Sequence, residues 1–282
     1  MIIGYTTGVF DMFHIGHLNI LRRAKEQCDY LIVGVSTDEL VERYKHKHPI
    51  IPFENRCAIV EAIRYVDKVV PQIDKNKYGA WEGLHFHKMF VGSDWEGTPQ
   101  WIEFEKQFQP VGVEIVYLPH TDGISSSLLR TKITPPRISI TISDSQCVGY
   151  TTGVYDMFHI GHLNILLRAK ERCDYLMVGV STDEVVEEYK HHRPIVPFEE
   201  RAAIVSSIKY VDEVVPQTTM DKVVFLKEHH FDVMFHGDEW KGTELYSDYE
   251  KEFARYGARI EYLPHTEGVS STMLRNILNK SI

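Results

Sequence analysis

Two histidines, His14 and His17, stand where a strand-like run at 2–7 gives way to a pattern with the spacing of a helix. The unpaired backbone N–H groups and the positive end of a helix start attract phosphate. Gly16, between the two histidines, lets the backbone approach a ligand without a Cβ in the way. Two imidazoles aimed at the same spot can donate hydrogen bonds to charge that builds on a phosphoryl group. The pattern predicts nucleotidyl-transfer chemistry.

This histidine stretch occurs twice. Gly4–His17 returns as Gly149–His162 with one change, Phe10 to Tyr155, and the same offset continues to Arg130 and Arg275. The chain is therefore a duplication of a whole domain. A metal half-site would need a third and fourth ligand at recognisable spacing, and none is evident nearby. A buried structural histidine accounts for one imidazole but not for the whole repeated pattern.

Composition limits the classes of function. The 282 residues are 43% hydrophobic and 25% charged, which is typical of a globular protein. A formal net charge of −9 without a basic tract argues against a nucleic-acid partner. No apolar run reaches the length of a membrane span, no export signal precedes the first strand, and the four cysteines form no CxxC pair. We expect a cytoplasmic protein with no membrane association.

The predicted organisation is two α/β domains in tandem. We expect one domain at 1–134, a linker at 135–146 and a second domain at 147–282. In the first copy, strand patterns fall at 2–7, 30–36, 66–71, 87–92 and 113–118, and helical patterns at 17–27, 53–64, 99–108 and 126–133. The stretch from Asp38 to Lys47 begins as a polar helix and becomes a basic loop. The alternation predicts Rossmann-like, doubly wound parallel sheets, with ligands at the carboxyl ends of the strands. Ile138, Ile140 and Ile142 alternate in the linker, which leaves a short edge strand open there.

Two basic stretches recur in both copies. Lys45 and Lys47 lie in a loop that can close over a triphosphate, and Lys190 is the second copy's equivalent of Lys45. A solvated charge run is the alternative. Arg64 ends a predicted helix, where a cation is favourable without any function. It is still a candidate for phosphate binding, and its counterpart Lys209 is a weaker one.

Two further stretches follow predicted strands at the same edge of the sheet. Asp94-Trp95, matched by Glu239-Trp240, offers an acid and an aromatic ring that could read a base, although loop packing explains the tryptophan equally well. Leu118–Arg130, matched by Leu263–Arg275, runs from a strand through glycine to serines at a helix start. Ser125 or Ser126 would cap that helix in any protein. Facing the histidines, these hydroxyls would form a second phosphate cradle.

The combination of motifs resembles the cytidylyltransferase family of nucleotidyltransferases. Gly-x-Phe-Asp-x-x-His-x-Gly-His is similar to its first signature, and the His120–Ser127 stretch is similar to its second, with histidine (His120, His265) in place of arginine. The Arg64–Asp67 and Asp94–Gly97 segments look most like bacterial glycerol-3-phosphate cytidylyltransferases. The resemblance covers nearly all of each copy. It implies an enzyme that joins CTP to a small phosphorylated alcohol, releases pyrophosphate and requires Mg²⁺.

The resemblance also implies roles for particular residues. It assigns catalysis to His14, His17, His159 and His162, which would steady the α-phosphate transition state, and to Lys45, Lys47 and Lys190. Asp11 and Asp156 are weaker candidates for holding the metal. The residues assigned to nucleotide binding are Thr7, Gly8, Val9, Phe10, Gly16, Arg64, Asp94, Trp95, His120, Thr121, Ile124, Ser125 and Ser126, with Thr152, Gly153, Val154, Tyr155, Gly161, Glu239, Trp240, His265, Thr266, Val269, Ser270 and Ser271 in the second copy.

Several alternatives stay open. Ser-Ser-Ser-Leu-Leu-Arg also resembles the close of adenylyltransferases, which would mean ATP. His-Ile-Gly-His is the class I aminoacyl-tRNA synthetase signature, but the Lys-Met-Ser-Lys-Ser-like loop of that class is missing. The tandem layout resembles ethanolamine-phosphate cytidylyltransferase, and a nucleotide-binding regulatory module with one inactive half is the alternative of another class. Because single-domain relatives act as dimers, we expect the two copies to form an intramolecular pseudo-dimer.

Overall fold

The computed structural model describes residues 1–119, 146–266 and 268–280 of the chain. The chain divides into two compact units, Met1–Ile124 and Ser125–Ile282. Each unit contains a five-stranded sheet in which all paired strands are parallel. The predicted Rossmann-like α/β fold is confirmed for both copies.

The first unit has the strand order β3-β2-β1-β4-β5. Its strands are β1 (Ile3–Gly8), β2 (Tyr30–Ser36), β3 (Lys68–Gln72), β4 (Lys88–Gly92) and β5 (Glu114–Leu118). Its helices are α1 (Ile15–Lys25), α2 (Asp38–Lys45), α3 (Phe53–Ala62), α4 (Lys77–Leu84) and α5 (Pro99–Phe108), with the short 3₁₀ turns η1 (Ser93–Trp95) and η2 (Gln109–Val111).

The second unit repeats this arrangement with the order β10-β9-β6-β7-β8. Its strands are β6 (Val148–Gly153), β7 (Tyr175–Ser181), β8 (Glu213–Gln217), β9 (Val233–Gly237) and β10 (Arg259–Leu263). Its helices are α7 (Ile160–Lys170), α8 (Asp183–Lys190), α9 (Phe198–Ser206), α10 (Lys222–His229), η3 (Asp238–Trp240), α11 (Glu244–Arg255) and α12 (Ser271–Lys280).

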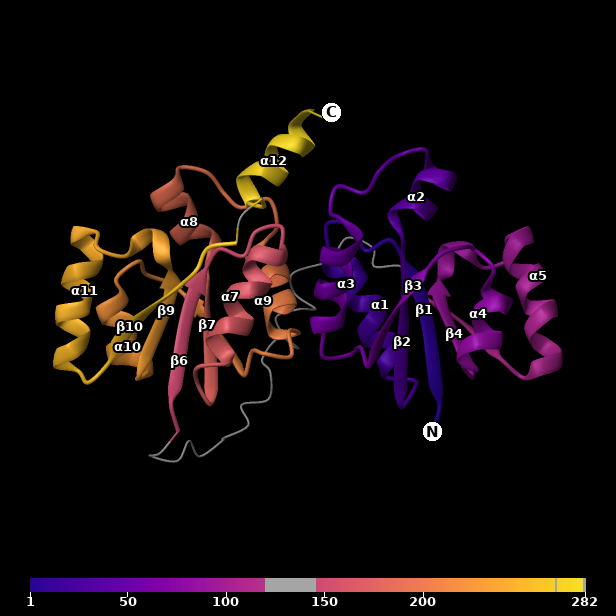
Figure 1. The fold of residues 1–282 in the computed structure, drawn as a ribbon, viewed down its shortest axis with the longest axis horizontal. Coiled ribbons are helices and arrows are strands. Elements are labelled where there is room, and N and C mark those ends of the chain that lie inside the picture. Colours follow the sequence, from indigo (N-terminus) through magenta and orange to yellow (C-terminus); the bar gives the residue numbers. More distant parts are fainter. Residues whose placement is uncertain (120–145, 267, 281–282) are drawn as a thin grey trace. The chain divides into compact units, whose positions relative to one another are not determined.

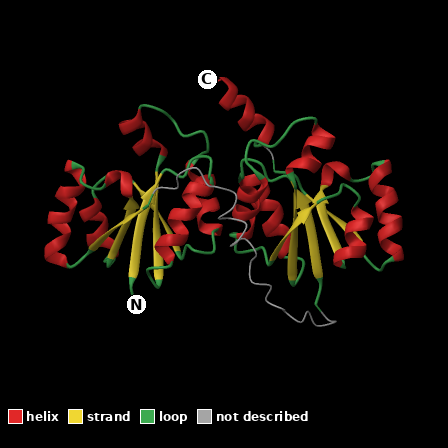
Figure 2. Cartoon of the chain, turned by 180° about the vertical axis from the view of Figure 1, so that it is seen from behind, coloured by secondary structure: helices red, strands yellow, loops and turns green. Residues whose placement is uncertain are grey.

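Helices cover both faces of each sheet (Figure 1). In the first unit α1 and α3 lie on one face and α4 and α5 on the other, and α7 and α9 oppose α10 and α11 in the second unit (Figure 1; Figure 2). The chain order reverses at the first strand of each unit, between β1 and β4 and between β6 and β9. In open parallel sheets ligands bind outside the carboxyl ends of the strands at such a reversal.

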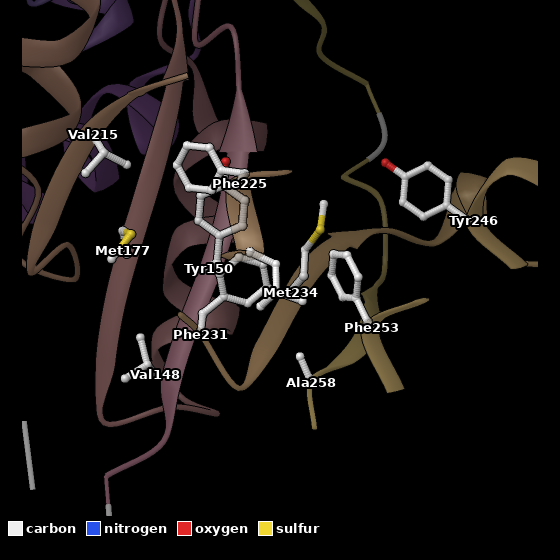
Figure 3. Packing of buried hydrophobic residues seen from close by; sticks show 11 residues of the cluster. Val148, Tyr150, Met177, Val215, Phe225, Phe231, Met234, Tyr246, Phe253 and Ala258 are labelled. Carbon is white, nitrogen blue, oxygen red and sulfur yellow. The ribbon is translucent and has the colours of Figure 1, made fainter. Parts of the chain in front are cut away.

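Aromatic rings fill the core on the α10–α11 face of the second sheet. The ring of Tyr150 lies between those of Phe225 and Phe231, at centroid distances of 4.5 and 4.8 Å (Figure 3). In the first unit the ring of Tyr5 stacks on Phe86 at 4.8 Å. These rings fix the central strand of each unit, and with it the site at the strand's carboxyl end.

The strands predicted for the first unit are confirmed to within two residues, as are the helices near 17–27, 53–64 and 99–108. Helix α1 begins at Ile15 rather than at residue 17, because His14 caps it. Helix α4 was not predicted: Gly79 and Gly83 weaken its helical signal. The predicted helix at 126–133 and the possible edge strand at 138–142 lie outside the described residues.

Candidate active site

The two histidines of the first unit form the cap of α1. His14 has extended backbone angles, and its Nδ1 accepts a hydrogen bond from the backbone N–H of Gly16 at 3.1 Å. The Nδ1 of His17 accepts one from the backbone N–H of His14 at 3.4 Å. The two rings stack with centroids 3.8 Å apart. Each imidazole is therefore held by the backbone of the helix start.

The second unit reproduces this geometry. The Nδ1 atoms of His159 and His162 accept hydrogen bonds from Gly161 N and His159 N at 3.1 and 3.4 Å, and the rings are again 3.8 Å apart. The predicted pairing of the histidines at a helix start is confirmed in both copies.

The hydrogen bonds determine where the protons of the imidazoles lie. An Nδ1 that accepts from a backbone N–H carries no proton, so the ring is neutral with its N–H at Nε2. Burial lowers the pKa of His14, and it lowers the pKa of His17 to about 3, with smaller contributions from the neighbouring side chains of His14 and Lys45. Burial also lowers the pKa of His159 to about 4, with a smaller contribution from His265. These rings are therefore neutral at pH 7, each with one N–H to donate.

Gly16 is required by the fold of the cap. A Cβ at this position would lie 2.8 Å from Cε1 and 3.0 Å from Nδ1 of His14, and Gly161 is crowded in the same way by His159. A larger residue would push the imidazole off the backbone N–H that orients it.

Strained backbone precedes each cap. Phe10 and Met12 have positive φ angles of 55° and 46°, and their counterparts Tyr155 and Met157 have 56° and 48°. Such conformations cost free energy in non-glycine residues and gather at functional sites. The buried ring of Phe10 packs against His17 with centroids 5.2 Å apart, and Tyr155 packs against His162 in the same way. Phe10 thus supports the imidazole from the core side.

Asp11 fixes the loop that follows α2. Its carboxylate accepts hydrogen bonds from the backbone N–H groups of Ile50 and Ile51, both at 2.9 Å. Asp156 binds the equivalent two residues of the second unit and also pairs with Arg275 at 3.2 Å. Across the described parts of both units, no group of three or more histidine, cysteine or acidic side chains is placed to hold a metal ion.

Arg56 is a buried guanidinium that ties the site together. It is 1% exposed, and it donates hydrogen bonds to the carbonyl oxygens of Val9, Ser36 and Ile51 and to the carboxylate of Asp38. Arg201 makes the equivalent four contacts in the second unit. This positioning role could not be predicted from the sequence, because nothing in the spacing of these arginines shows that they are buried.

The basic loop is brought to the histidines only in part. Lys45, the last residue of α2, lies near enough to lower the pKa of His17, and Lys190 acts in the same way on His162. Lys47 is exposed in the loop, and its counterpart His192 lies against the guanidinium of Arg275, with Nε2 3.0 Å from Nη1.

The start of α12 faces the histidines of the second unit, as predicted. Ser270 caps the helix by accepting from Met273 N at 3.1 Å. The hydroxyl of Ser271 donates to the carbonyl of Asp156 at 2.8 Å and lies 3.3 Å from Nε2 of His159. Since that hydroxyl hydrogen is committed to Asp156, the serine oxygen accepts from the Nε2–H of His159.

Other predicted residues of this segment take structural positions. The hydroxyl of Thr266 accepts from Asn164 at 3.0 Å, and the side chain of Val269 lies next to Gly161. The backbone N–H of His265 donates to Asp238 at 3.1 Å. The first copy's His120, Thr121, Ile124, Ser125 and Ser126 lie outside the described residues.

The remaining predicted residues divide by location. Those at the end of the first strand of each unit surround the histidine caps: Thr7, Gly8 and Val9 in the first unit, and Thr152, Gly153 and Val154 in the second. Asp94, Trp95, Glu239 and Trp240 follow β4 and β9 at the same edge, and the two tryptophans are 46% and 39% exposed, as a stacking role requires. Arg64 follows α3 and precedes β3, so within its own unit it lies at the amino ends of the strands. The site is at their carboxyl ends, and Arg64 is therefore not brought to it.

Comparison with known proteins identifies the family. The cytidylyltransferase-like family matches residues 5–132 and again residues 150–277. The chain belongs to the cytidylyltransferase-like family.

Curated relatives of this nucleotidyltransferase match it in two ways. A probable ethanolamine-phosphate cytidylyltransferase of Encephalitozoon cuniculi is 30% identical over 82% of this chain and 80% of its own length. The ethanolamine-phosphate cytidylyltransferase of Dictyostelium discoideum is 29% identical over 95% of this chain and 88% of its own length. The glycerol-3-phosphate cytidylyltransferase of Bacillus subtilis is 39% identical over 45% of this chain and 94% of its own length. The first two therefore match across most of the tandem chain, and the third over a single-domain length.

A buried lysine in each half of this cytidylyltransferase escaped the sequence analysis. Lys77, the first residue of α4, is 8% exposed and donates to the hydroxyl of Thr7 at 2.8 Å. Lys222 opens α10 in the same position and is 5% exposed. Burial lowers the pKa of each to about 8. One feature of the sequence could have indicated these lysines. Lys77 and Lys222 are the same residue in the two copies, although the residues on either side of them differ.

Lys77 reaches the carboxyl end of β1 from the α4 face of the sheet, whereas the histidines belong to α1 on the other face. Two sets of hydrogen-bond donors therefore flank the end of one strand.

Among the helices of the described segments, none combines the length and the apolar character that a membrane span demands.

Proposed function

We propose that each half of the chain transfers a cytidylyl group from CTP to a small phosphorylated alcohol, giving a CDP-alcohol and pyrophosphate. The observation that carries this proposal is the pair of neutral imidazoles at each helix start, whose Nδ1 atoms accept backbone hydrogen bonds and so place the ring N–H at Nε2. Fixed N–H donors aimed at a developing oxyanion stabilise a transition state without reorganisation.

The reaction needs no general base. A phosphate oxygen of the acceptor attacks the α-phosphorus of CTP and forms a new P–O–P bond. The bond from that phosphorus to the β-phosphate oxygen breaks, and pyrophosphate leaves with the electron pair. A phosphate monoester is already largely ionised at neutral pH, because its second pKa is about 6. The enzyme therefore has to align the two substrates and neutralise their charge.

The two donor sets suggest how the substrates divide the site. The histidines, Lys45 or Lys190, and the start of α12 in the second half suit the triphosphate of the nucleotide. Lys77 and Lys222, on the opposite face, suit the phosphate of the acceptor, because a buried ammonium gains most from an anionic partner. Trp95 and Trp240 are exposed where a base can stack.

The described residues do not form a resident magnesium site. Asp11 is engaged by two backbone N–H groups, Asp156 also by Arg275, and no third ligand lies nearby. A magnesium ion would have to be bound largely through the phosphates of the nucleotide, as is common for this metal.

The acceptor and the nucleotide each have two candidates. Relatives that match over most of the chain are named for ethanolamine phosphate, and those that match over one domain for glycerol 3-phosphate. We favour ethanolamine phosphate as an acceptor, because those relatives share the tandem arrangement, and glycerol 3-phosphate is the second candidate. The alternative nucleotide is ATP, which would make the protein an adenylyltransferase.

The test measures pyrophosphate release by the full chain from CTP or ATP, with ethanolamine phosphate or glycerol 3-phosphate as acceptor. We expect release with CTP and at least one of the acceptors. Release with ATP alone, or none with any pair, would refute the proposal.

A further inference from the structure

In the first half, the end of α2 is tied to the loop between β3 and α4. The guanidinium of Arg43 donates a hydrogen bond from Nη2 to the carbonyl oxygen of Ile73 at 2.7 Å. The ammonium of Lys75 lies over the ring of Tyr44, with Nζ 3.9 Å from the ring centroid, which is the geometry of a cation–π contact. Two contacts of different chemistry therefore join adjacent residues of the helix end to nearby residues of the loop.

Each of the joined segments carries a lysine of the site. Lys45 follows Tyr44 directly and is the last residue of α2, on the side of the histidines. Lys77 comes two residues after Lys75 and opens α4, beside the end of β1. In the proposed function Lys45 faces the triphosphate and Lys77 faces the acceptor phosphate. The two contacts thus connect the parts of the chain that hold the two substrates.

Two substitutions remove these contacts from the second half. Glu188 stands in the position of Arg43, and a carboxylate has no hydrogen to donate to a carbonyl oxygen. Met220 stands in the position of Lys75 and carries no charge. The ring of Tyr189, at the end of α8, is 39% exposed. Neither contact therefore has a counterpart among the described residues of the second half.

The framework around the substituted positions is the same in both halves. Helices α2 and α8 both end at a histidine in the left-handed conformation, His46 with φ 53° and His191 with φ 57°. The side-chain amide of Gln72 closes the loop after β3 by donating to the carbonyl of Asp74 at 2.9 Å, and Gln217 repeats this bond after β8 at the same length. The difference between the halves therefore lies in side chains and not in the path of these backbone segments.

A link of this kind makes the binding of one substrate favour the binding of the other. A loop that closes over a triphosphate loses conformational freedom, and the loss is smaller when the loop is already held. An acceptor phosphate at Lys77 orders the segment before α4. Through Arg43 and Lys75 that order reaches the end of α2, so CTP binds with less further ordering.

We propose that Arg43 and Lys75 are positioning residues that couple the nucleotide and acceptor sites of the first half, so that an acceptor phosphate tightens the binding of CTP there, whereas the second half lacks this coupling. The inference rests on the proposed function and adds that the halves differ in how their two substrates bind. Neither side chain has to touch a substrate, because each is engaged with the protein. An exposed contact of either type contributes about threefold, so we expect about tenfold coupling from the two.

The test measures how the KM for CTP depends on the acceptor concentration in full-length chains with one active half. His162→Ala leaves the first half active, and His17→Ala leaves the second. Pyrophosphate release is followed over a grid of concentrations of CTP and of ethanolamine phosphate or glycerol 3-phosphate. In the first half, saturating acceptor should lower the KM for CTP about tenfold, and in the second half by less than about twofold.

Replacing the two side chains by those of the second half separates coupling from other effects. Arg43→Glu with Lys75→Met in the His162→Ala chain should remove the coupling and change kcat little, because the catalytic groups stay in place. Lys75→Arg should keep most of the coupling, since a guanidinium also stacks on an aromatic ring. The matched control is Lys106→Met, which removes the same charge from an exposed lysine of α5 and should leave the coupling unchanged.

The reciprocal exchange tests whether the two side chains are sufficient. Glu188→Arg with Met220→Lys in the His17→Ala chain should introduce coupling into the second half, and thermal denaturation checks that each variant is folded. If the first-half variant does not fold, this exchange decides, and a KM for CTP that stays independent of acceptor overturns the inference. Equal coupling in the two halves, or full coupling without Arg43 and Lys75, overturns it but leaves the proposed function intact. No pyrophosphate from the unaltered chain with any acceptor would instead refute the proposed function.

Discussion

Replacing His17 or His162 by alanine uses each half of the chain as the control for the other. If the halves act independently, His17→Ala should remove the first half's share of pyrophosphate release and leave the second half's share. His162→Ala should do the reverse. The double variant should lose both shares, because the same donor is missing from both sites.

The size of the loss follows from the geometry. Removing one preorganised donor to a developing oxyanion typically lowers turnover by about 10²–10³-fold. The same substitution removes the bond from His14 N to the Nδ1 of His17, which is long at 3.4 Å. The cost of that bond in folding free energy is therefore below about 1 kcal/mol. The variant should stay folded, and its loss of activity should not come from unfolding.

The assay is steady-state pyrophosphate release from CTP and a saturating acceptor, with CTP binding measured by calorimetry on the same samples. We expect the double variant to lose about 10²–10³-fold in kcat while CTP binds with nearly unchanged Kd. If either single change abolishes all turnover, the halves are coupled or unequal, and the reading as two independent sites is wrong. Normal turnover by the double variant would show that these imidazoles do not act on the transition state.

Four further outcomes are expected. Lys77→Met and Lys222→Met should each raise the acceptor KM of their own half by about tenfold or more without changing the Kd for CTP, and kinetics in chains with one active half will measure this. Because the pKa values of His17 and His159 are lowered to about 3 and 4, the unfolded chain binds more protons below pH 6.5. Stability should therefore be steady above pH 6.5 and fall as the pH drops towards 3, and thermal denaturation of His17→Ala should show a shallower fall. Calorimetric titration should give close to two CTP sites per chain, whereas one site would make a half regulatory. Light scattering should give the mass of one chain if the halves pair within it, and twice that mass would contradict an intramolecular pseudo-dimer.

The sequence was sufficient to predict the strands and the histidine pairs for a physical reason. Buried parallel strands produce apolar runs, and a helix start after a strand can be recognised from glycine and spacing. The hydrogen bonds that set the tautomer of His14 and His17 could not be predicted, because they depend on the extended backbone of His14. The placement of Arg64 shows the opposite limit. Its position at a helix end was predicted correctly, but that helix end lies at the amino ends of the strands, away from the site of its own unit.

Lys77 shows why the acceptor side was harder to predict. A lysine at the start of a weakly helical segment reads as an ordinary surface residue. It reaches β1 only because the strand order reverses there, which brings α4 onto the other face of the sheet. The contact thus depends on the arrangement of the whole sheet, and no local pattern contains it.

The duplication separates residues that the fold requires from those that an acceptor would select. Arg56 and Arg201 are unchanged, and each is committed to four protein acceptors, so their retention follows from the cost of leaving a buried charge or carbonyl unpaired. Lys77 and Lys222 are also unchanged, but only the ammonium of Lys77 binds a side chain, that of Thr7, among the described residues. Protein contacts alone therefore do not account for the retention of both lysines. An anionic ligand common to the two halves would account for it, and the phosphate of an acceptor is such a ligand.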